Sequence, residues 1–444
     1  MIPVLVGLDH RTAPLALRER LHADDAHLLP LLASLATGPD APLREIVVLS
    51  TCNRYEVYAT GESPALAQDA IVDCLLSARN VATQPLLDAL YRKEGMEATR
   101  HLFRVAAGLE SLVLGETQIM RQVADALAQA QEAGTCGALL SRLFTAALHT
   151  GKRARTETAI SQHTLSVSHA AALLVERELA SVTAPRIVIV GAGEMAALAA
   201  DALAQQGQAS ISLVNRGETR AREVAGRLGV QARSWGELEQ VVAGADAVIT
   251  ATSARQPVLS VDDIAASRRS DPARSLLLVD IGVPRNIAPA TSQAAAIQLY
   301  DIDDLQAVVA QPPVLREAEV ARVEAIIAGE ALGYTHWLNS RYVVPVLTEL
   351  RSRADAIAAA ELEHALRRLP DLDAHERDVM AQMAQRIVHK LLHTPTVTLK
   401  SRAARGDHFD YDHAIRKLFA LDPLKRDTDD TDDANETGSD SDDG

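Results

Sequence analysis

The chain has 444 residues, 48% of them hydrophobic, and carries a formal net charge of −15. This length leaves room for two or three domains with sizeable cores. The sequence holds no apolar run of about 18 residues, so we expect no membrane-spanning segment. Its negative charge argues against indiscriminate binding to DNA or RNA. Residues 427–444 contain nine acidic residues and no Lys or Arg, which predicts a disordered, solubilising acidic tail over 423–444.

The three cysteines, Cys52, Cys74 and Cys136, are widely separated. Their spacing provides neither a disulfide framework nor a Cys-x-x-Cys metal pair, so we expect no metal site and a reducing compartment. The N-terminus has no basic segment and meets Asp9 too early for a secretory signal peptide. We therefore expect a cytoplasmic protein.

Residues 1–160 are predicted to form a compact α+β domain. A short apolar strand at 4–8 opens it, a second strand runs from 47 to just before Cys52, and a third follows at 55–58. Helical patterns fall at 11–21, 24–36, 64–78, 96–108, 117–133 and 139–149, with a short mixed segment at 81–90. For the first helix, Thr12 is the expected N-cap and Pro14 lies in the first turn.

Strands and helices alternate over residues 161–310, after a helical lead-in at 161–184 that holds a helix at 164–179. The expected strands are 186–190, 211–214, 247–251 and 276–281, and the expected helices between them are 218–228 and 235–242. This order is typical of a doubly wound parallel sheet of the Rossmann type.

A glycine-rich motif follows the first of these strands and opens a helix. Its residues are Gly191, Ala192, Gly193, Glu194, Met195 and Ala196. The first glycine makes the turn, the second lets the backbone approach a pyrophosphate, and the helix N-terminus favours the phosphate charge. The next strand ends in Asn215 and Arg216 instead of an acidic residue. Unless Arg216 is an ordinary solvated residue, it favours the 2′-phosphate of NADPH over NADH. Thr250, Thr252 and Ser253 are expected beside the nicotinamide.

Residues 311–422 are predicted to form a helical domain, because apolar residues recur at helical spacing between Arg and Glu. The expected helices cover 314–341, 345–369, 374–393 and 408–421. A few elongated helices offer little self-contained core, so we expect them to form a homodimer interface. The alternative is a monomeric helical cap.

Cys52 lies at the tight join between two predicted strands, and its neighbours Thr51, Asn53 and Arg54 are polar. A cysteine that only fills a core has apolar neighbours, which is the alternative for an isolated residue of this kind. A hydroxyl, an amide and a guanidinium could hold a substrate and favour a thiolate. Arg54 could also pair with a substrate carboxylate in a bidentate manner.

A second polar stretch surrounds the start of the helix expected at 117–133. Gln118 and Gln122 are four residues apart and share a helix face, and Glu116 lies where a carboxylate is favoured. Each alone would be an ordinary capping or solvated residue. Together with Ser111 they indicate a polar ligand pocket.

At this point the sequence resembles the glutamyl-tRNA reductase family. The resemblance covers the chain to about residue 422 and rests on several uncommon motifs in family order, at 7–14, 50–54, 101–111, 115–118, 191–195, 215–216 and 280–285. The departures are Ala196, where glycine is common, and the acidic tail, which lies outside the family core.

The resemblance implies that Cys52 is a nucleophile and that His101 assists proton transfer; by spacing alone His101 would be a helix-surface histidine. It implies a glutamyl-binding pocket made by Thr51, Cys52, Asn53, Arg54, Ser111, Glu116, Thr117, Gln118 and Gln122. The implied reaction is NADPH-dependent reduction of glutamyl-tRNA(Glu) through a cysteine thioester to glutamate-1-semialdehyde, the first step of tetrapyrrole synthesis from glutamate. A homodimer and transfer of the product to an aminomutase are further implications.

Two other functions fit the residues less well. A shikimate-type dehydrogenase acting on a free acid would want a lysine–aspartate pair instead of a cysteine between strands. An NADPH-sensing, tRNA-binding scaffold would not need Cys52. Contacts to tRNA are expected among the basic residues Lys152, Arg153, Arg155, Arg351, Arg353, Arg367 and Arg368, each of which could equally belong to a solvated helix face.

Overall fold

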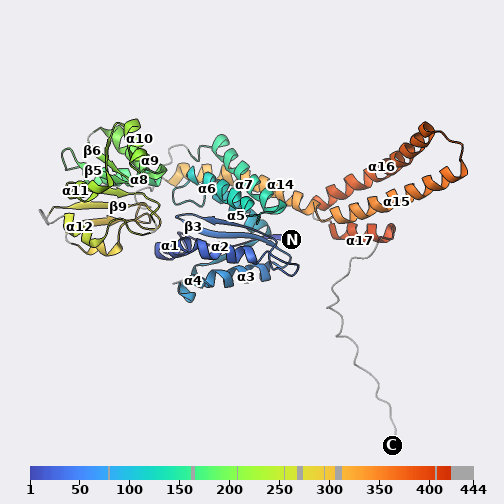
Figure 1. Cartoon of the computed structure of the whole chain (residues 1–444), viewed down its shortest axis with the longest axis horizontal. Coiled ribbons are helices and arrows are strands. Elements are labelled where there is room, and N and C mark those ends of the chain that lie inside the picture. Colours follow the sequence, from blue (N-terminus) through green and yellow to red (C-terminus); the bar gives the residue numbers. More distant parts are fainter. Residues whose placement is uncertain are drawn as a thin grey trace, which may run out of the picture. The chain divides into compact units, whose positions relative to one another are not determined.

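The computed structural model describes residues 1–78, 81–161, 166–207, 209–254, 256–267, 274–294, 296–305, 313–405 and 408–421. The chain forms two compact units, Met1–Ala331 and Leu332–Gly444 (Figure 1). The acidic tail expected at 423–444 and the expected start of a helix at Thr164 lie outside the described residues.

A four-stranded antiparallel sheet organises the N-terminal part of the first unit. Its strands are β1 (Ile2–Asp9), β2 (Glu45–Ser50), β3 (Arg54–Gly61) and β4 (Tyr91–Glu94), in the order β2-β3-β1-β4. Apolar residues of β1 pack against helices α1 (Leu15–Ala23), α2 (Asp25–Ser34) and α3 (Pro64–Leu76) on one side. Helices α5 (Gly95–Ala106), α6 (Gln118–Glu132) and α7 (Ala138–Glu157) lie on the other side (Figure 1). This is the expected α+β domain.

The first helix starts later than expected. The carboxylate of Asp9 accepts hydrogen bonds from the backbone N–H groups of Arg11 (2.9 Å) and Thr12 (3.3 Å), which closes a turn before the helix. Pro14 then has an extended backbone, and α1 begins at Leu15. Thr12 is therefore not the N-cap.

The segment expected to be mixed at 81–90 holds helix α4 (Thr83–Ala89), and β4 follows it. We did not predict β4. It is four residues long and only partly buried, and its sequence Tyr-Arg-Lys-Glu lacks the apolar alternation that would predict a strand. Helix α7 also runs past the expected end at His149, to Glu157.

The rest of the first unit contains a six-stranded parallel sheet in the order β10-β9-β8-β5-β6-β7. Its strands are β5 (Arg186–Val190), β6 (Ser210–Val214), β7 (Gln231–Arg233), β8 (Ala247–Thr250), β9 (Leu276–Asp280) and β10 (Ile297–Tyr300). The expected Rossmann topology is confirmed, with β7 and β10 as short strands that the sequence pattern did not mark.

Helices cover both faces of this sheet, and β5 shows why. Ile187 and Ile189 belong to the hydrophobic cluster on one face, with α8 (Val167–Glu178) and α9 (Glu194–Gln206), whereas Val188 and Val190 belong to the cluster on the other. The second face is covered by α11 (Leu238–Ala243) and α12 (Val261–Ser267). Burial on both sides explains the continuous apolar run of this strand. Helix α10 (Glu218–Leu228) follows β6.

The C-terminal part is helical, as expected. Its helices are α14 (Pro313–Ser340), α15 (Val344–Arg368), α16 (Ala374–Ala404) and α17 (His408–Leu418). Helix α16 was expected to end at His393 but continues through Pro395. Leu392, Leu399 and Ala403 on this helix are buried in one cluster with residues of α15 and α17, and this packing offsets the hydrogen bond that Pro395 cannot make. Within the described residues, none of the helices combines the length and apolar character needed to cross a bilayer.

Candidate active site

Cys52 lies in the three-residue turn between β2 and β3, as expected. The Thr51 Oγ1 accepts hydrogen bonds from the backbone N–H groups of Asn53 and Arg54, both at 3.2 Å, and the Thr51 N–H donates to the Arg54 carbonyl at 2.9 Å. The carbonyl of Asn53 accepts from the N–H of His10 at 2.8 Å. Thr51 and Asn53 thus build the turn that presents Cys52. Their contact with a substrate stays a prediction.

The thiol of Cys52 is not held as a thiolate by its polar neighbours. Burial, followed by the negative charge of Glu116, raises the pKa of the Cys52 thiol to about 12. Arg18 and Arg54 act in the opposite direction but do not compensate. The expectation of a lowered pKa is therefore wrong for the protein without substrate, because removal of water outweighs two nearby positive charges.

Glu56 is the centre of a buried polar network that we did not predict. It is 0% exposed, and its Oε1 accepts hydrogen bonds from Arg54 Nη1 (2.7 Å), His101 Nε2 (2.8 Å) and Tyr91 Oη (2.6 Å). Its Oε2 accepts from Tyr58 Oη at 2.7 Å. Burial opposes ionisation of Glu56, yet Arg54 and His101 outweigh it, and the pKa of this carboxyl lies well below its usual range.

This network holds Arg54 and His101, two of the predicted site residues. Arg54 Nη1 donates to Glu56 and Nη2 donates to the carbonyl of Glu110, so Arg54 has a structural role in the network, and its contact with a substrate carboxylate stays a prediction. His101 is buried and its Nε2 is held by Glu56. A signal for Glu56 was present: Arg54, Glu56 and Tyr58 alternate along β3 and share one face. Charged residues inside a strand rarely point into a core without partners.

The loop before α6 brings Glu116 toward the cysteine. Gly108 and Gly115 have φ of +79° and +80°, and a Cβ on Gly108 would lie 2.9 Å from the Cα of Gly115. Arg155 reaches the same loop and donates to the carbonyls of Ala106 (3.3 Å) and Glu116 (3.0 Å). Arg155 is half-buried and helps to hold this loop, and its contact with tRNA stays a prediction.

Glu116 is only 9% exposed. Burial raises the pKa of its carboxyl to about 7, although Arg54 acts in the other direction. Since Glu116 also acts on the Cys52 thiol, the three ionisable groups Cys52, Arg54 and Glu116 form one electrostatic cluster.

The remaining predicted pocket residues differ in exposure. Gln118 is half-buried, and its Nε2 is buried without a hydrogen-bond partner. Buried polar groups are normally hydrogen-bonded, so this nitrogen could donate to a ligand. Ser111 and Gln122 are half-buried. Thr117 is exposed and makes no side-chain capping bond to α6. Their binding to a substrate stays a prediction.

We expect Glu116→Gln to stabilise the protein above neutral pH. The folded state holds the Glu116 proton more tightly than the unfolded state, so stability falls as pH rises from the ordinary carboxyl pKa of 4.5 to about 7. The substitution removes this cost, and we expect a gain of about 3 kcal/mol at about pH 8 and much less at about pH 5. Urea unfolding at both pH values measures it, with the exposed Glu132→Gln as control. An equal gain at both pH values would contradict the raised pKa.

The glycine-rich motif connects β5 to α9 as expected. Gly191 has a φ of +126°, and a Cβ there would collide with the carbonyl oxygen of Ala251. Gly193 is the N-cap of α9, and nothing lies within 4 Å of where its Cβ would be. Ala196 is fully buried, in the packing position. Open space before an unblocked helix N-terminus suits a pyrophosphate.

Glu194 and Met195, the next two residues of the motif, contact neighbouring helices. Glu194 is exposed and its Oε2 pairs with Arg121 Nη1 of α6 at 2.8 Å. The sulfur of Met195 accepts from Ser168 Oγ of α8 at 3.5 Å. Ala192 between the glycines is buried. Contact of these residues with a cofactor stays a prediction.

Two arginines follow β6, the strand that pairs with β5. Asn215 Nδ2 donates to the carbonyl of Gly217 at 3.1 Å, which shapes the turn after β6. The exposed Arg216 places its guanidinium 5.0 Å above the ring of Trp235. Arg220, which we did not predict, donates from Nε to the carbonyl of Ala192 at 3.4 Å. The signal for Arg220 was its place in the first turn of α10.

Thr250 does not line a nicotinamide site. It is fully buried, and its Oγ1 donates to Asp280 Oδ1 at 2.8 Å. The same carboxylate also accepts from the backbone N–H groups of Gly282, Asn286 and Ile287. This ties the loop after β9 to β8. Thr252 is half-buried and Ser253 is exposed at the end of β8.

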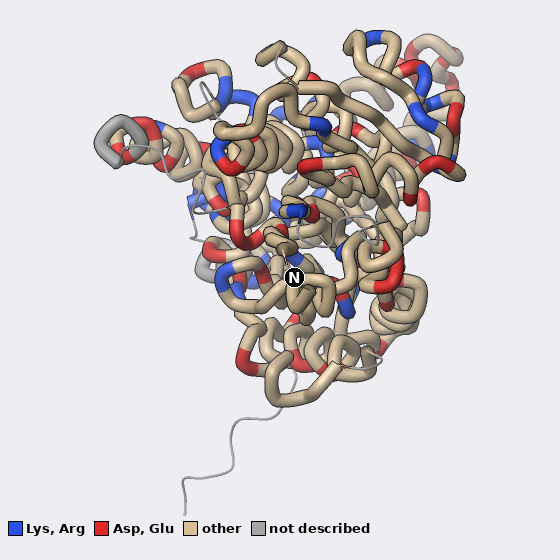
Figure 2. The backbone as a smooth tube through the Cα atoms, turned by 90° about the vertical axis from the view of Figure 1, so that its left-hand side faces the viewer, with Lys and Arg blue, Asp and Glu red and all other residues tan. Residues whose placement is uncertain are grey.

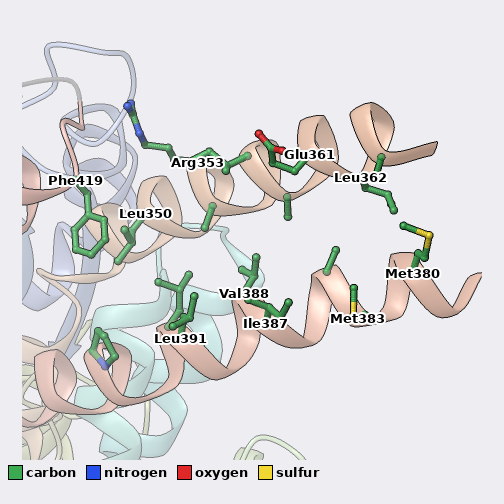
Figure 3. Close-up of a pocket in the computed structure, with 17 residues that line it drawn as sticks. Leu350, Arg353, Glu361, Leu362, Met380, Met383, Ile387, Val388, Leu391 and Phe419 are labelled. Carbon is green, nitrogen blue, oxygen red and sulfur yellow. The ribbon is translucent and has the colours of Figure 1, made fainter. Parts of the chain in front are cut away.

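The second unit has an apolar groove between α15 and α16. It has a volume of about 600 Å³; Leu362 lies opposite Met380 at one end, and Leu350 lies near Leu391 and Phe419 at the other (Figure 3). Leu391, which also lines this groove, is 69% exposed. An exposed apolar face of this kind marks an interaction surface.

Basic residues do not form a continuous stripe in the view of Figure 2, where Lys and Arg positions are interspersed with Asp and Glu among the described residues. Arg153 pairs with Glu157 and Glu330, and Arg353 donates to the carbonyl of Ala420. Lys152, Arg351, Arg367 and Arg368 are exposed, and Arg367 pairs with Glu363 on the same helix. These four remain the basic candidates with the most accessible charge.

Comparison with known proteins agrees with this arrangement. Residues 6–158 match the family model described as the N-terminal domain of glutamyl-tRNA(Glu) reductase, residues 322–421 match its dimerisation domain, and residues 173–308 match shikimate/quinate 5-dehydrogenase. Glutamyl-tRNA reductase of Moorella thermoacetica is 40% identical over 422 residues, which is 95% of each chain. That of Chloroflexus aurantiacus is 38% identical over 430 residues, covering 94% of this chain and 99% of the relative.

Among solved structures, glutamyl-tRNA reductase from Methanopyrus kandleri is 32% identical and covers 93% of this chain and 98% of its own, with a TM-score of 0.47. The expected three-part fold class is confirmed, with an N-terminal α+β part, an NAD(P)-binding Rossmann part and a C-terminal dimerisation part. The chain belongs to the glutamyl-tRNA reductase family.

Proposed function

We propose that this chain reduces glutamyl-tRNA(Glu) to glutamate-1-semialdehyde with NADPH and releases the tRNA, as the first step of tetrapyrrole synthesis. The observation that carries the proposal is the position of Cys52. Its thiol lies in a fixed turn beside an ionisable carboxyl, and it packs against the hydrophobic cluster of the Rossmann domain. A nucleophile beside a dinucleotide-binding domain suits acyl transfer followed by reduction.

The first step needs a proton acceptor, because the thiol has a raised pKa. Glu116 is the carboxylate whose charge acts on Cys52, and its pKa of about 7 lets it accept a proton at neutral pH. We therefore give Glu116 a part in proton transfer, and we propose that His101, which Glu56 orients, assists it.

The sulfur then bonds to the carbonyl carbon of the glutamyl ester, and the bond from that carbon to the ribose oxygen breaks. The oxygen takes up the proton and tRNA leaves, so that glutamate remains as a thioester on Cys52. Bound NADPH would supply a hydride that brings this carbon to the aldehyde level. The carbon–sulfur bond breaks last, and a thiolate leaves far more easily than an alkoxide would. The partly buried Gln118, with its unpartnered Nε2, is proposed to contact the glutamyl group together with Ser111, Thr117 and Gln122.

The open N-terminus of α9 fits the pyrophosphate of the cofactor, and the two arginines fit a 2′-phosphate. We expect Arg216→Glu to raise the KM for NADPH by about 10- to 100-fold, because one charge-assisted contact is lost and a repulsive charge is added. The KM for NADH should change by less than about threefold. Steady-state kinetics with both cofactors measure this, with Arg233→Glu, an exposed arginine on β7, as the matched control. A parallel rise for both cofactors would contradict recognition of the 2′-phosphate.

A single assay separates the proposed reaction from the alternatives. The protein is incubated with labelled glutamyl-tRNA and NADPH, and labelled aldehyde and labelled protein are measured after acid quenching. Aldehyde together with a thiol-sensitive protein label supports the proposal. Reduction of an uncharged acid, or binding of tRNA without product, would replace it by a small-acid dehydrogenase or a binding scaffold.

The homodimer is proposed to form through the groove of α15 and α16, because this surface is apolar and lies in the dimerisation domain. We further propose a cytoplasmic enzyme, in keeping with three free cysteines. A handover of the reactive aldehyde to an aminomutase would fit the chemistry. We also propose that the chain divides functionally at residues 160, 310 and 422.

A further inference from the structure

Helix α1 turns one face toward the Rossmann domain. Leu15, Arg18 and Glu19 are spaced at i, i+3 and i+4, so they share this face. Leu15 is buried in the same hydrophobic cluster as Ile281 and Ile302 of the Rossmann domain. The two polar residues of the face each meet a charged partner from that domain.

Arg18 joins the cysteine turn to an acidic residue 285 positions away. It is 1% exposed, and its Nη1 donates to the carbonyl of Cys52 at 2.8 Å and to Asn53 Oδ1 at 3.2 Å. Its Nη2 donates to both carboxylate oxygens of Asp303, at 2.5 and 2.7 Å. One guanidinium thus holds the main chain of the nucleophile and a side chain of the nucleotide-binding domain at the same time.

Asp303 is well fixed on its own side. It lies in the turn after β10, its N–H donates to Asp301 Oδ1 at 3.0 Å, and Ile302 beside it is fully buried. Next to this contact, Glu19 forms a second ion pair with Arg285 Nη2 at 2.9 Å. The side chain of Asp303 is 38% exposed, so its ion pair with Arg18 adds little to stability, and the value of the contact lies in geometry.

We propose that Arg18 is a positioning residue that couples the seating of the Rossmann domain, through Asp303, to the backbone of the Cys52 turn. The proposal rests on the proposed function and deepens it. Acyl transfer from tRNA to Cys52 uses groups of the N-terminal domain alone. Hydride transfer needs the Rossmann domain seated against the turn, so the Arg18–Asp303 contact acts on the second step.

The test separates the two steps in the full-length protein. Acylation of Cys52 by labelled glutamyl-tRNA is measured without NADPH, and aldehyde formation is then measured after mixing the acylated protein with NADPH. We expect Asp303→Asn to leave acylation within about twofold of the parent protein and to slow aldehyde formation at least about tenfold, because the carboxylate charge that pairs with Arg18 is lost. Asp262→Asn, an exposed carboxylate on α12, is the control and should change neither step.

Arg18→Lys supplies the second variant. A lysine cannot reach the turn and Asp303 together, so we expect both steps to slow. The double variant Arg18→Lys/Asp303→Asn should slow aldehyde formation no more than the worse single variant, since both act through one contact. Two results for Asp303→Asn would overturn the proposal: an unchanged rate of aldehyde formation, or equal slowing of acylation and aldehyde formation. Absence of any acylated parent protein would instead overturn the proposed function and this coupling with it.

Discussion

Cys52→Ala is expected to abolish formation of glutamate-1-semialdehyde, with a loss of at least about a thousandfold in single-turnover rate. The side chain sits where β2 turns into β3 and has no substitute in that turn, since Thr51 Oγ1 already accepts two backbone hydrogen bonds. Cys52→Ser should be nearly as inactive, because an oxygen ester accepts hydride less readily and an alkoxide leaves less readily than a thiolate. The assay follows labelled aldehyde and the acid-stable protein label together.

Cys136→Ser is the matched control for this result. Cys136 is also a half-buried free thiol, and burial raises its pKa to about 11, but it lies at the start of α7 outside the electrostatic cluster. We expect it to retain full activity. Semialdehyde formation at the parent rate by Cys52→Ala would show that reduction proceeds without covalent capture.

Glu56→Ala is expected to destabilise the fold by about 3–5 kcal/mol, because it leaves the buried guanidinium of Arg54 without its carboxylate. The loss also removes the acceptor for three other side chains, Tyr58, Tyr91 and His101. We expect activity to fall as well, since His101 is no longer oriented. Urea unfolding measures the change in the free energy of unfolding, and we expect the m-value to stay unchanged.

The exposed Glu62, just after the same strand, provides the comparison. Its side chain is 74% exposed and lies 3.5 Å from Arg44, so Glu62→Ala should cost less than about 0.5 kcal/mol. The double variant Arg54→Met/Glu56→Leu should recover much of the stability lost by Glu56→Ala, because neither charge then remains buried. It should recover no activity. A Glu56→Ala loss as small as that of Glu62→Ala would show that water fills the network.

The parts of the site that depend on local pattern were predictable from the sequence. The turn at Cys52 follows from an apolar run that ends in polar residues, and the nucleotide motif follows from glycines placed between a strand and a helix. Fold class came from the same local periodicities. The short strand β4 and the continuation of α16 through Pro395 were missed, because tertiary packing decides them and local preference does not.

The parts that depend on residues far apart in the chain were not predictable. Arg18 meets Asp303 and Arg155 meets Glu116 only after folding, and nothing in their sequence neighbourhoods marks these pairs. The sign of the thiol shift was wrong for a related reason. Polar neighbours in sequence indicate charge but not the loss of water, and burial is the larger effect on Cys52.

The two-sided burial of β5 has a consequence for redesign of the nucleotide site. Consecutive side chains of this strand alternate between two separate cores, so exchange of one apolar residue for another disturbs only one layer. Deleting a single residue from the strand would instead move the side chains on one side of the deletion to the opposite face of the sheet. It would also shift Gly191 away from its position beside the Ala251 carbonyl, where a Cβ would collide. The glycine-rich motif is thus more sensitive to the number of residues in β5 than to which apolar residues β5 contains. A motif grafted into another protein must keep that number.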